Sequence, residues 1–202
     1  LESVPVDIHA LAQNIITGFS HYQKLDGLEI KLEISDKITH SYFTDPTRLT
    51  QVLNNLLSNA VKFTEKGSIV LSVEITDTQS INKNTFDWLH ISVKDTGIGI
   101  STQNQALLFT PFIQADDEVT RKFGGTGLGL SICQEIVRAM GGEIKLESTL
   151  GKGSLFHFTL KFKRASIVQR VNERRKNPRA FHDKQDERFR HFRVLVAEDN
   201  LV

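Results

Sequence analysis

The stretch QVLNNLLSNAVKFT, residues 51–64, decides how the rest of this chain is interpreted. Read as a helix, it predicts one apolar face, formed by Leu49, Val52, Leu53, Leu56, Leu57 and Ala60. The same spacing gathers polar side chains on another face, namely Gln51, Asn55, Ser58, Asn59 and Lys62. Each asparagine costs a helix interior about 0.5–0.7 kcal/mol relative to alanine, so the cluster of Asn54, Asn55 and Asn59 needs a further reason. Paired amides above a lysine would hold a metal ion and phosphate oxygens, although an amide-rich solvent face explains the same pattern.

Composition places the chain among soluble globular proteins. It has 202 residues, of which 39% are hydrophobic and 24% are charged. No apolar run approaches the roughly 18 residues of a membrane span, and residues 1–10, LESVPVDIHA, lack the layout of a signal peptide. The single Cys133 excludes an intramolecular disulfide and a cysteine-based zinc site, and it indicates a reducing, cytoplasmic compartment.

Charge divides the chain unevenly. Residues 163–193 contain eleven Lys/Arg and four Asp/Glu, hence a net charge of +7, whereas the part before Lys163 is mildly acidic. We therefore expect a domain over residues 1–162 and a basic linker over 163–191. The basic run would also suit nucleic acid, but no recognition motif accompanies it, so a solvated linker and no nucleic-acid partner are expected.

Periodicity predicts alternating helices and strands. Helices are expected at 6–23, from Asp45-Pro46 to a stop at Gly67, at 103–109 and at 128–140. Strands are expected at 28–35, up to Tyr42-Phe43, and at 68–76, 88–93, 143–148 and 155–162, with a hairpin loop at 77–86. Antiparallel hairpins between helices indicate an α/β sandwich with helices on one face of the sheet.

Two glycine-rich stretches carry further signals. Asp95 begins DTGIGI, residues 95–100, directly after a strand, and a carboxylate placed there would accept a hydrogen bond from an exocyclic amine such as adenine N6. A turn explains that stretch equally well. GGTGLGLSI, residues 124–132, opens a helix whose exposed amides would form an anion site. Neither the dinucleotide fingerprint nor the P-loop matches it, so a nucleotide site of another kind is required.

The stretch between them, LFTPFIQADDEVTRKF at residues 108–123, has no clear periodicity. Its length is typical of a mobile lid. The basic pair Arg121-Lys122 would close over phosphates, with a solvated charge pair as the plain alternative.

Taken together, these stretches resemble the ATP-binding catalytic domain of sensor histidine kinases, in the superfamily that includes gyrase, the heat-shock chaperone ATPases and the mismatch-repair ATPases. NLLSNAVKFT (55–64) is similar to the N box, DTGIGI (95–100) to the G1 box, LFTPF (108–112) to the F box and GGTGLGL (124–130) to the G2 box. FRVLVAEDN (192–200) is similar to the start of a receiver domain, which gives a truncated receiver over 192–202 and points to a hybrid kinase. The resemblance implies a Bergerat-type two-layer fold with a mixed, mainly antiparallel sheet.

The resemblance also implies roles for individual residues. Asn59 would ligate Mg²⁺, while Asn55 and Lys62 would contact phosphate or the water shell of the metal and serve the catalytic step. Asp95 would bind the adenine amine. The remaining ATP-binding residues implied are Gly97, Gly99, Ile100, Phe112, Arg121, Lys122, Gly125, Thr126, Gly127, Leu128 and Gly129. Oxygen ligands and retained water suit magnesium, and transfer would depend on positioning and charge stabilisation.

One position distinguishes a kinase from a hydrolase. ATPases of the superfamily place a water-activating glutamate four residues before the metal-binding asparagine, where this chain has Asn55, which accepts no proton at neutral pH. We therefore expect a protein-histidine kinase. The alternatives are a conformational ATPase of the same superfamily and a non-catalytic nucleotide-binding module.

The expected partners lie outside this sequence. The family's phosphoacceptor pattern, H-[ED]-x-x-x-P, is absent, because His182-Asp183 lacks the proline. The chain should therefore bind nucleotide without phosphorylating itself. The acceptor would be the histidine of an upstream dimerisation domain, followed by a receiver domain or response regulator. We expect the isolated fragment to be a monomer and the full-length protein to be a homodimer. An upstream membrane anchor in the full-length protein is compatible with the sequence.

Overall fold

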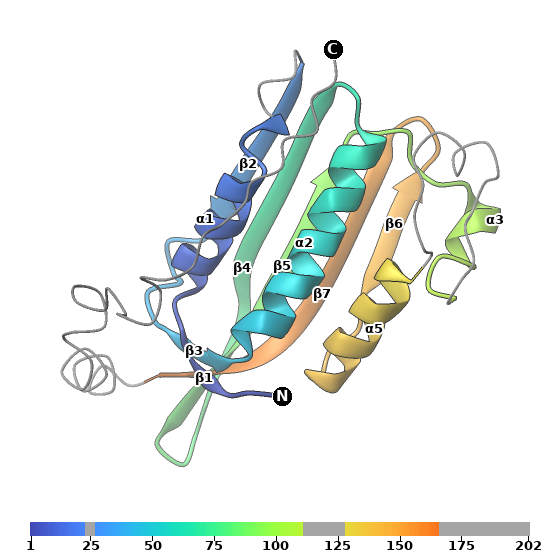
Figure 1. The fold of residues 1–202 in the computed structure, drawn as a ribbon. Coiled ribbons are helices and arrows are strands. Elements are labelled where there is room, and N and C mark those ends of the chain that lie inside the picture. The colour runs from blue at the N-terminus through green and yellow to red at the C-terminus, as the bar shows by residue number, and fades with distance from the viewer. Residues whose placement is uncertain (23–26, 111–127, 166–202) are drawn as a thin grey trace, which may run out of the picture. The chain divides into compact units, whose positions relative to one another are not determined.

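In residues 1–22, 27–110 and 128–165, the part of the chain that the computed structural model describes, seven strands form one sheet (Figure 1). The strands are β1 (Val4–Val6), β2 (Leu28–Ile34), β3 (Tyr42–Thr44), β4 (Gly67–Ile81), β5 (Asn84–Asp95), β6 (Lys145–Thr149) and β7 (Gly153–Arg164). The helices are α1 (Ile8–Gly18), α2 (Pro46–Phe63), α3 (Thr102–Gln105) and α5 (Gly129–Ala139). The strand order is β1-β3-β7-β5-β4-β2, with β6 also paired to β7.

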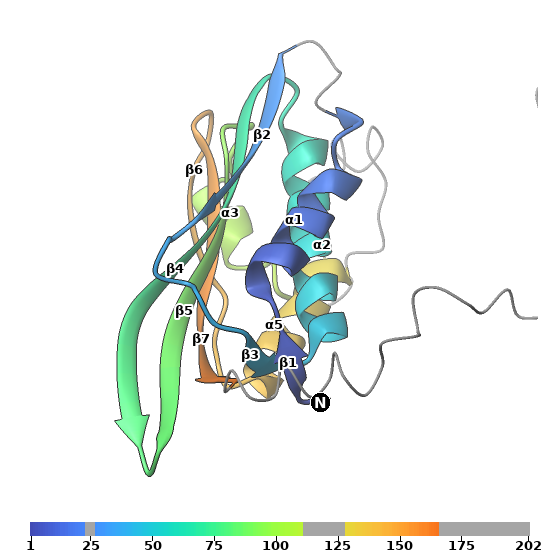
Figure 2. The same cartoon turned by 90° about the vertical axis from the view of Figure 1, so that its left-hand side faces the viewer.

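The architecture is a two-layer sandwich. Helices α1, α2 and α5 cover one face of the sheet, as the edge-on view in Figure 2 shows. Among the described residues, only β2 and β4 pair in parallel, and the other strand pairs are antiparallel. The predicted α/β sandwich with a mainly antiparallel sheet is confirmed. None of the helices in the described ranges is long and apolar enough to cross a membrane.

Helix α2 packs across the middle of the sheet, as its periodicity predicts. Its buried residues are the six assigned to the apolar face, Leu49, Val52, Leu53, Leu56, Leu57 and Ala60. The carboxylate of Asp45 caps the helix, accepting a hydrogen bond from the Arg48 amide at 3.0 Å, and Pro46 occupies the first turn. The helix ends at Phe63 rather than at Gly67, which instead begins β4 with a φ of 120°.

Several segments differ from the sequence prediction. The first helix, expected at 6–23, spans only Ile8–Gly18 because Asp7 caps it, and Val6 belongs instead to strand β1 beside β3. The helix expected at 103–109 is limited to α3. The loop expected at 77–86 is wrong: β4 and β5 stay paired up to Ile81 and Asn84 and turn through Asn82 and Lys83, both with positive φ. This end of the hairpin extends past the helices (Figure 1), so neither of its faces needs apolar residues.

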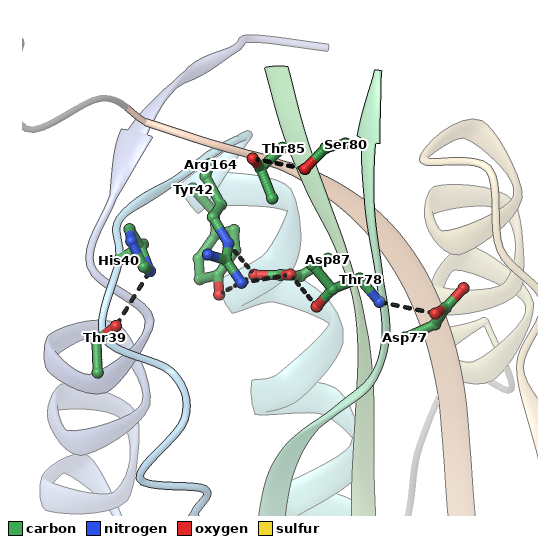
Figure 3. A network of polar contacts seen from close by, with 9 residues as sticks. All are labelled: Thr39, His40, Tyr42, Asp77, Thr78, Ser80, Thr85, Asp87 and Arg164. Atoms are coloured by element: carbon green, nitrogen blue, oxygen red, sulfur yellow. Dashed lines mark hydrogen bonds and ion pairs between the residues drawn. The ribbon is translucent and has the colours of Figure 1, made fainter. Parts of the chain in front are cut away.

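A buried polar network fixes the end of the last strand. Strand β7 continues to Arg164, past the domain end predicted at residue 162. The Arg164 guanidinium binds Asp87 through two hydrogen bonds of 2.7 and 2.9 Å. Tyr42 and Thr78 also donate to this fully buried carboxylate, at 2.7 and 2.6 Å (Figure 3). The predicted linker and receiver segment, from residue 166 onward, lies outside the described residues.

Candidate functional site

The polar face of α2 brings together three predicted site residues. Asn59 donates from Nδ2 to Oδ1 of Asn55 at 3.2 Å, and both side chains are partly buried. Lys62 lies nearly one turn further along, with Nζ 4.9 Å from the centroid of the Phe63 ring. Asn54, by contrast, is exposed. The helix therefore presents a row of two coupled amides and an ammonium group.

The N-terminus of α5 lies against this row. Gly129 is the first residue of α5, and a Cβ added there would collide with the amide nitrogen of Asn55. Leu128 precedes it as the N-cap and supplies no side-chain cap. Amides of a first helical turn carry partial positive charge and attract anions. The helix start and the amides of α2 thus form one surface suited to phosphate oxygens.

Asp95 ends β5 with a buried carboxylate. Its exposed fraction is 6%, and the backbone amides of Gly97 and Ser154 both donate to Oδ1, at 2.8 and 3.3 Å. Burial raises the pKa of the carboxyl above its usual value, against the effect of these two hydrogen bonds. The two amides fix Oδ1, so the orientation of the other carboxylate oxygen is fixed as well.

Three glycines allow close packing around Asp95. A Cβ on Gly97 would collide with the carbonyl oxygen of Phe63, at the end of α2. Gly99 has a φ of 66° and approaches the carbonyl of Thr149 in the same way. Gly153, with a φ of 97°, packs on the carbonyl of Asp95. Side chains at these positions would separate β5, α2 and the β6–β7 turn, so the glycines let these three segments pack closely around Asp95.

Ile100 is held by side chains from the β6 segment. Its amide donates to Oγ of Ser148 at 2.9 Å, and its carbonyl accepts from Nε2 of Gln105 at 2.8 Å. Gln105 also donates to the carbonyl of Ser148 at 3.0 Å. These contacts fix the end of the DTGIGI segment against β6.

Some predicted site residues lie outside the described residues. They are Phe112, Arg121, Lys122, Gly125, Thr126 and Gly127. The described ones form two groups. In the first, Asn55 contacts both Asn59 and Gly129. The second consists of Asp95, Gly97 and Ile100, which belong to one segment, residues 95–100. Phe63, which follows Lys62, links the groups by accepting a hydrogen bond from the Ile98 amide at 3.2 Å.

A separate hollow of about 740 Å³ lies along α5. Its lining includes Leu1, Arg48, Phe109 and Ile132, and none of the predicted site residues in the described ranges. The hollow is therefore distinct from the site around Asn55 and Asp95.

This arrangement matches a known family. Residues 44–164 match the family described as histidine kinase-, DNA gyrase B-, and HSP90-like ATPase. The chain belongs to this ATPase family. The matched region of the ATPase domain begins just before α2 and ends with β7, so it includes both groups of site residues.

Curated relatives of this ATPase domain include histidine kinases. The signal transduction histidine-protein kinase BarA of Escherichia coli (strain K12) is 40% identical over 158 residues, covering 78% of this chain and 17% of BarA. The hybrid signal transduction histidine kinase L of Dictyostelium discoideum is 38% identical over 159 residues, covering 78% of this chain and 9% of that protein. The chain thus spans less than a fifth of the length of these curated relatives.

A solved structure shows the same fold with a nucleotide analogue. The crystal structure of full-length ShkA in complex with AMPPNP superposes with a TM-score of 0.67 at 33% identity. The match covers 82% of this chain and 32% of ShkA.

The residues of this ATPase domain fit ATP and Mg²⁺ on two structural grounds. The hydrogen bond between the amides uses Nδ2 of Asn59, which leaves its Oδ1, a hard oxygen ligand of the kind magnesium prefers, outside that bond. Beside Gly97, the buried Oγ1 of Thr64 has no hydrogen-bond partner in the described ranges. An orphaned polar atom beside the glycine that donates to Asp95 is what a site for a polar ring would contain.

Sequence reasoning did not single out three residues of the site. Thr64 is the last residue of the stretch 51–64, and only its burial in the fold distinguishes it. Ser148 and Ser154 lie far along the chain from Asp95, and their roles depend on the pairing of β6 and β5 with β7.

Proposed function

We propose that this chain is the ATP-binding catalytic domain of a hybrid sensor histidine kinase, which transfers the γ-phosphoryl group of ATP to a histidine of a dimerisation domain. The observation that carries the proposal is the buried Asp95 carboxylate, held by two amides at the end of β5 and joined through Gly97 to the end of α2. Membership of the ATPase family and similarity to named histidine kinases support it.

Each described residue has a task in this proposal. The Asp95 carboxylate accepts a hydrogen bond from the exocyclic amine of adenine, and Gly97, Gly99 and Ile100 shape the wall of that pocket. Asn59 supplies an amide oxygen to Mg²⁺, which neutralises phosphate charge when bound. Asn55 and Lys62 orient the phosphates. Leu128 and Gly129 offer the first amides of α5 to them.

The residues outside the described ranges complete the proposal. Arg121 and Lys122 bind the terminal phosphates, and Phe112 belongs to the adjoining lid. In this proposal, backbone amides of Gly125, Thr126 and Gly127 also hold the β- and γ-phosphates. The proposed catalytic domain extends beyond residue 162 to the end of β7 at Arg164. A basic linker up to residue 191 follows it, and residues 192–202 are the proposed start of a receiver domain.

We favour a kinase over a conformational ATPase because of Asn55. Its Oδ1 accepts the hydrogen bond from Asn59, and an amide has no basic site that would take a proton from water. The partners proposed are an upstream dimerisation domain with the acceptor histidine, and a receiver domain or response regulator. The full-length protein would be a cytoplasmic or membrane-anchored homodimer, and this fragment a monomer that does not phosphorylate itself.

Nucleotide titration of Asp95→Asn tests the adenine assignment. Asn keeps an oxygen for the Gly97 and Ser154 amides but places a donor where the adenine amine needs an acceptor. We expect ATP affinity, measured by calorimetry with and without Mg²⁺, to fall at least tenfold, which is about 1.4 kcal/mol.

Asp45→Asn is the matched control, since Asp45 is equally buried at 7% and its carboxylate also accepts backbone amides, at the start of α2. It should bind ATP like the unaltered chain. Retained affinity in Asp95→Asn would refute the site assignment, and phosphohistidine on the isolated chain would refute the absence of an internal acceptor.

A further inference from the structure

The hydroxyl of Thr64 is buried without a partner at the junction of α2 and the Asp95 segment. Thr64 is the residue after α2 and has an exposed fraction of 2%. In the described ranges, its Oγ1 and that of Thr44 are the two buried side-chain polar atoms that lack a hydrogen bond. Burying a hydroxyl without a partner costs free energy, so such an atom calls for water or a ligand.

Its position indicates which ligand. Oγ1 lies 2.8 Å from the place that a Cβ on Gly97 would occupy. The amide of the same Gly97 donates to Asp95 Oδ1 at 2.8 Å. The backbone of this one glycine therefore lies next to both the orphaned hydroxyl and the buried carboxylate. The two side chains approach it from different elements, one from the end of α2 and the other from the end of β5.

We propose that Thr64 is a specificity-determining residue for the 6-aminopurine base, an assignment that rests on the proposed function. Its hydroxyl donates a hydrogen bond, directly or through one water, to the ring nitrogen N1, while Asp95 accepts one from the neighbouring 6-amino group. A hydroxyl donates and accepts, whereas an ionised carboxylate only accepts. Together they match the acceptor–donor pair at the edge of adenine. A 6-oxo base places an oxygen against Asp95 and a hydrogen on N1.

Removing the hydroxyl separates this role from a structural one. Thr64→Val keeps the shape of the side chain, and we expect the nucleotide-free chain to be at least as stable as before, because an unpaired buried hydroxyl is lost. ADP affinity should fall about five- to tenfold, the size of one neutral hydrogen bond. Thr64→Ser, which keeps the hydroxyl, should retain affinity.

Thr44→Val is the matched control. Thr44 lies in β3 with an exposed fraction of 5%, and its Oγ1 is the other orphaned hydroxyl in the described ranges. The same chemical change there should leave ADP affinity unaltered. A loss of affinity in both valine variants would indicate a general effect on the fold and would overturn the proposal.

The decisive experiment pairs these variants with ADP and 1-deaza-ADP, in which a carbon replaces N1. Calorimetric titration of the whole chain should show that the analogue binds the unaltered protein more weakly. The difference between the two ligands should disappear in Thr64→Val, or in Thr64→Ala if the valine variant does not fold. Equal ADP affinity in these variants and the unaltered chain, or a persisting difference between the ligands, would overturn the role of Thr64. If the unaltered chain binds no ADP, or Asp95→Asn binds it equally well, the proposed function itself fails.

Discussion

Asn59 donates a hydrogen bond to Asn55 across one turn of α2, with Nδ2 and Oδ1 3.2 Å apart. The bond couples the proposed metal ligand to the residue that stands where related hydrolases place a general base. It also fixes the Asn55 side chain next to Gly129, at the start of α5. Asn55 therefore contacts both the proposed metal ligand and the start of α5.

Asn55→Glu should increase the rate of ATP hydrolysis. A carboxylate at this position accepts a proton from water, and general-base catalysis contributes about 10²–10⁴-fold in enzymes that use it. We expect a rise of at least tenfold in phosphate release from ATP. Asn55→Gln, which has the same length without the basic group, is the control. Unchanged turnover in the glutamate variant, or an equal rise in the glutamine variant, would contradict the explanation.

Gly129→Ala should displace the Asn55 amide. Gly129 is the first residue of α5, where alanine gains less than the roughly 1 kcal/mol that it gains over glycine in a helix interior. The added Cβ would collide with Nδ2 of Asn55. The amide is the end of a flexible side chain, so it moves while the backbone stays in place. We expect nearly unchanged thermal stability together with a several-fold loss of affinity for ATP in the presence of Mg²⁺.

Gly18→Ala provides the comparison for this variant. Gly18 is also helical, at the end of α1, and a Cβ added there meets nothing within 4 Å. The substitution should stabilise the fold without changing ATP affinity. If Gly129→Ala behaves in the same way, the contact between α5 and Asn55 has no part in binding.

The sequence predicts those parts of the molecule whose pattern is local. All six apolar positions of α2 follow from the helical period, and they are buried as expected because the helix lies on the sheet along its length. The loop predicted at 77–86 is wrong because these strand residues do not alternate between apolar and polar. No helix covers the strands there, so neither face needs apolar side chains. Thr64 could not be identified in advance, since it comes to lie beside Gly97 only when β5 is paired with β4 in the folded chain.

Arg164→Met should destabilise the end of the sheet. Burial alone would raise the pKa of Asp87, but hydrogen bonds from Arg164, Thr78 and Tyr42 lower it below its usual value. Methionine is similar in length to the aliphatic part of the arginine side chain. The substitution would leave the buried Asp87 carboxylate with only the neutral donors Tyr42 and Thr78. Breaking a buried pair in this way costs about 3 kcal/mol, which urea unfolding at neutral pH would measure.

Arg138→Met is the control for this loss. Arg138 pairs with Glu135 at 3.1 Å, and the two side chains are 53% and 73% exposed. An exposed pair of this kind contributes about 0.5 kcal/mol or less. Equal effects of the two substitutions would show that the Asp87 network adds nothing beyond a surface ion pair.

His157 should make the fold sensitive to mild acid. Its ring lies 5.1 Å from that of His90, and its Nε2 is 3.5 Å from Oε1 of Glu147. Burial, followed by the charge of His90, lowers the pKa of His157 below its usual 6.5; Lys145 acts in the same direction and Glu147 in the opposite one. The unfolded chain therefore takes up this proton first, so stability present above pH 6.5 is lost as the pH falls below that value.

Two variants change this pH dependence in opposite directions. His157→Gln removes the titrating group and should flatten the decline of stability between about pH 6.5 and 5, the range in which an ordinary histidine takes up its proton. Glu147→Gln removes the carboxylate that favours the protonated ring, lowers the pKa of His157 further and should steepen the decline. Urea unfolding midpoints measured across this range would show both effects. A Glu147→Gln profile flatter than that of the unaltered chain would mean that Glu147 does not act on His157, and the decline would then need another titrating group.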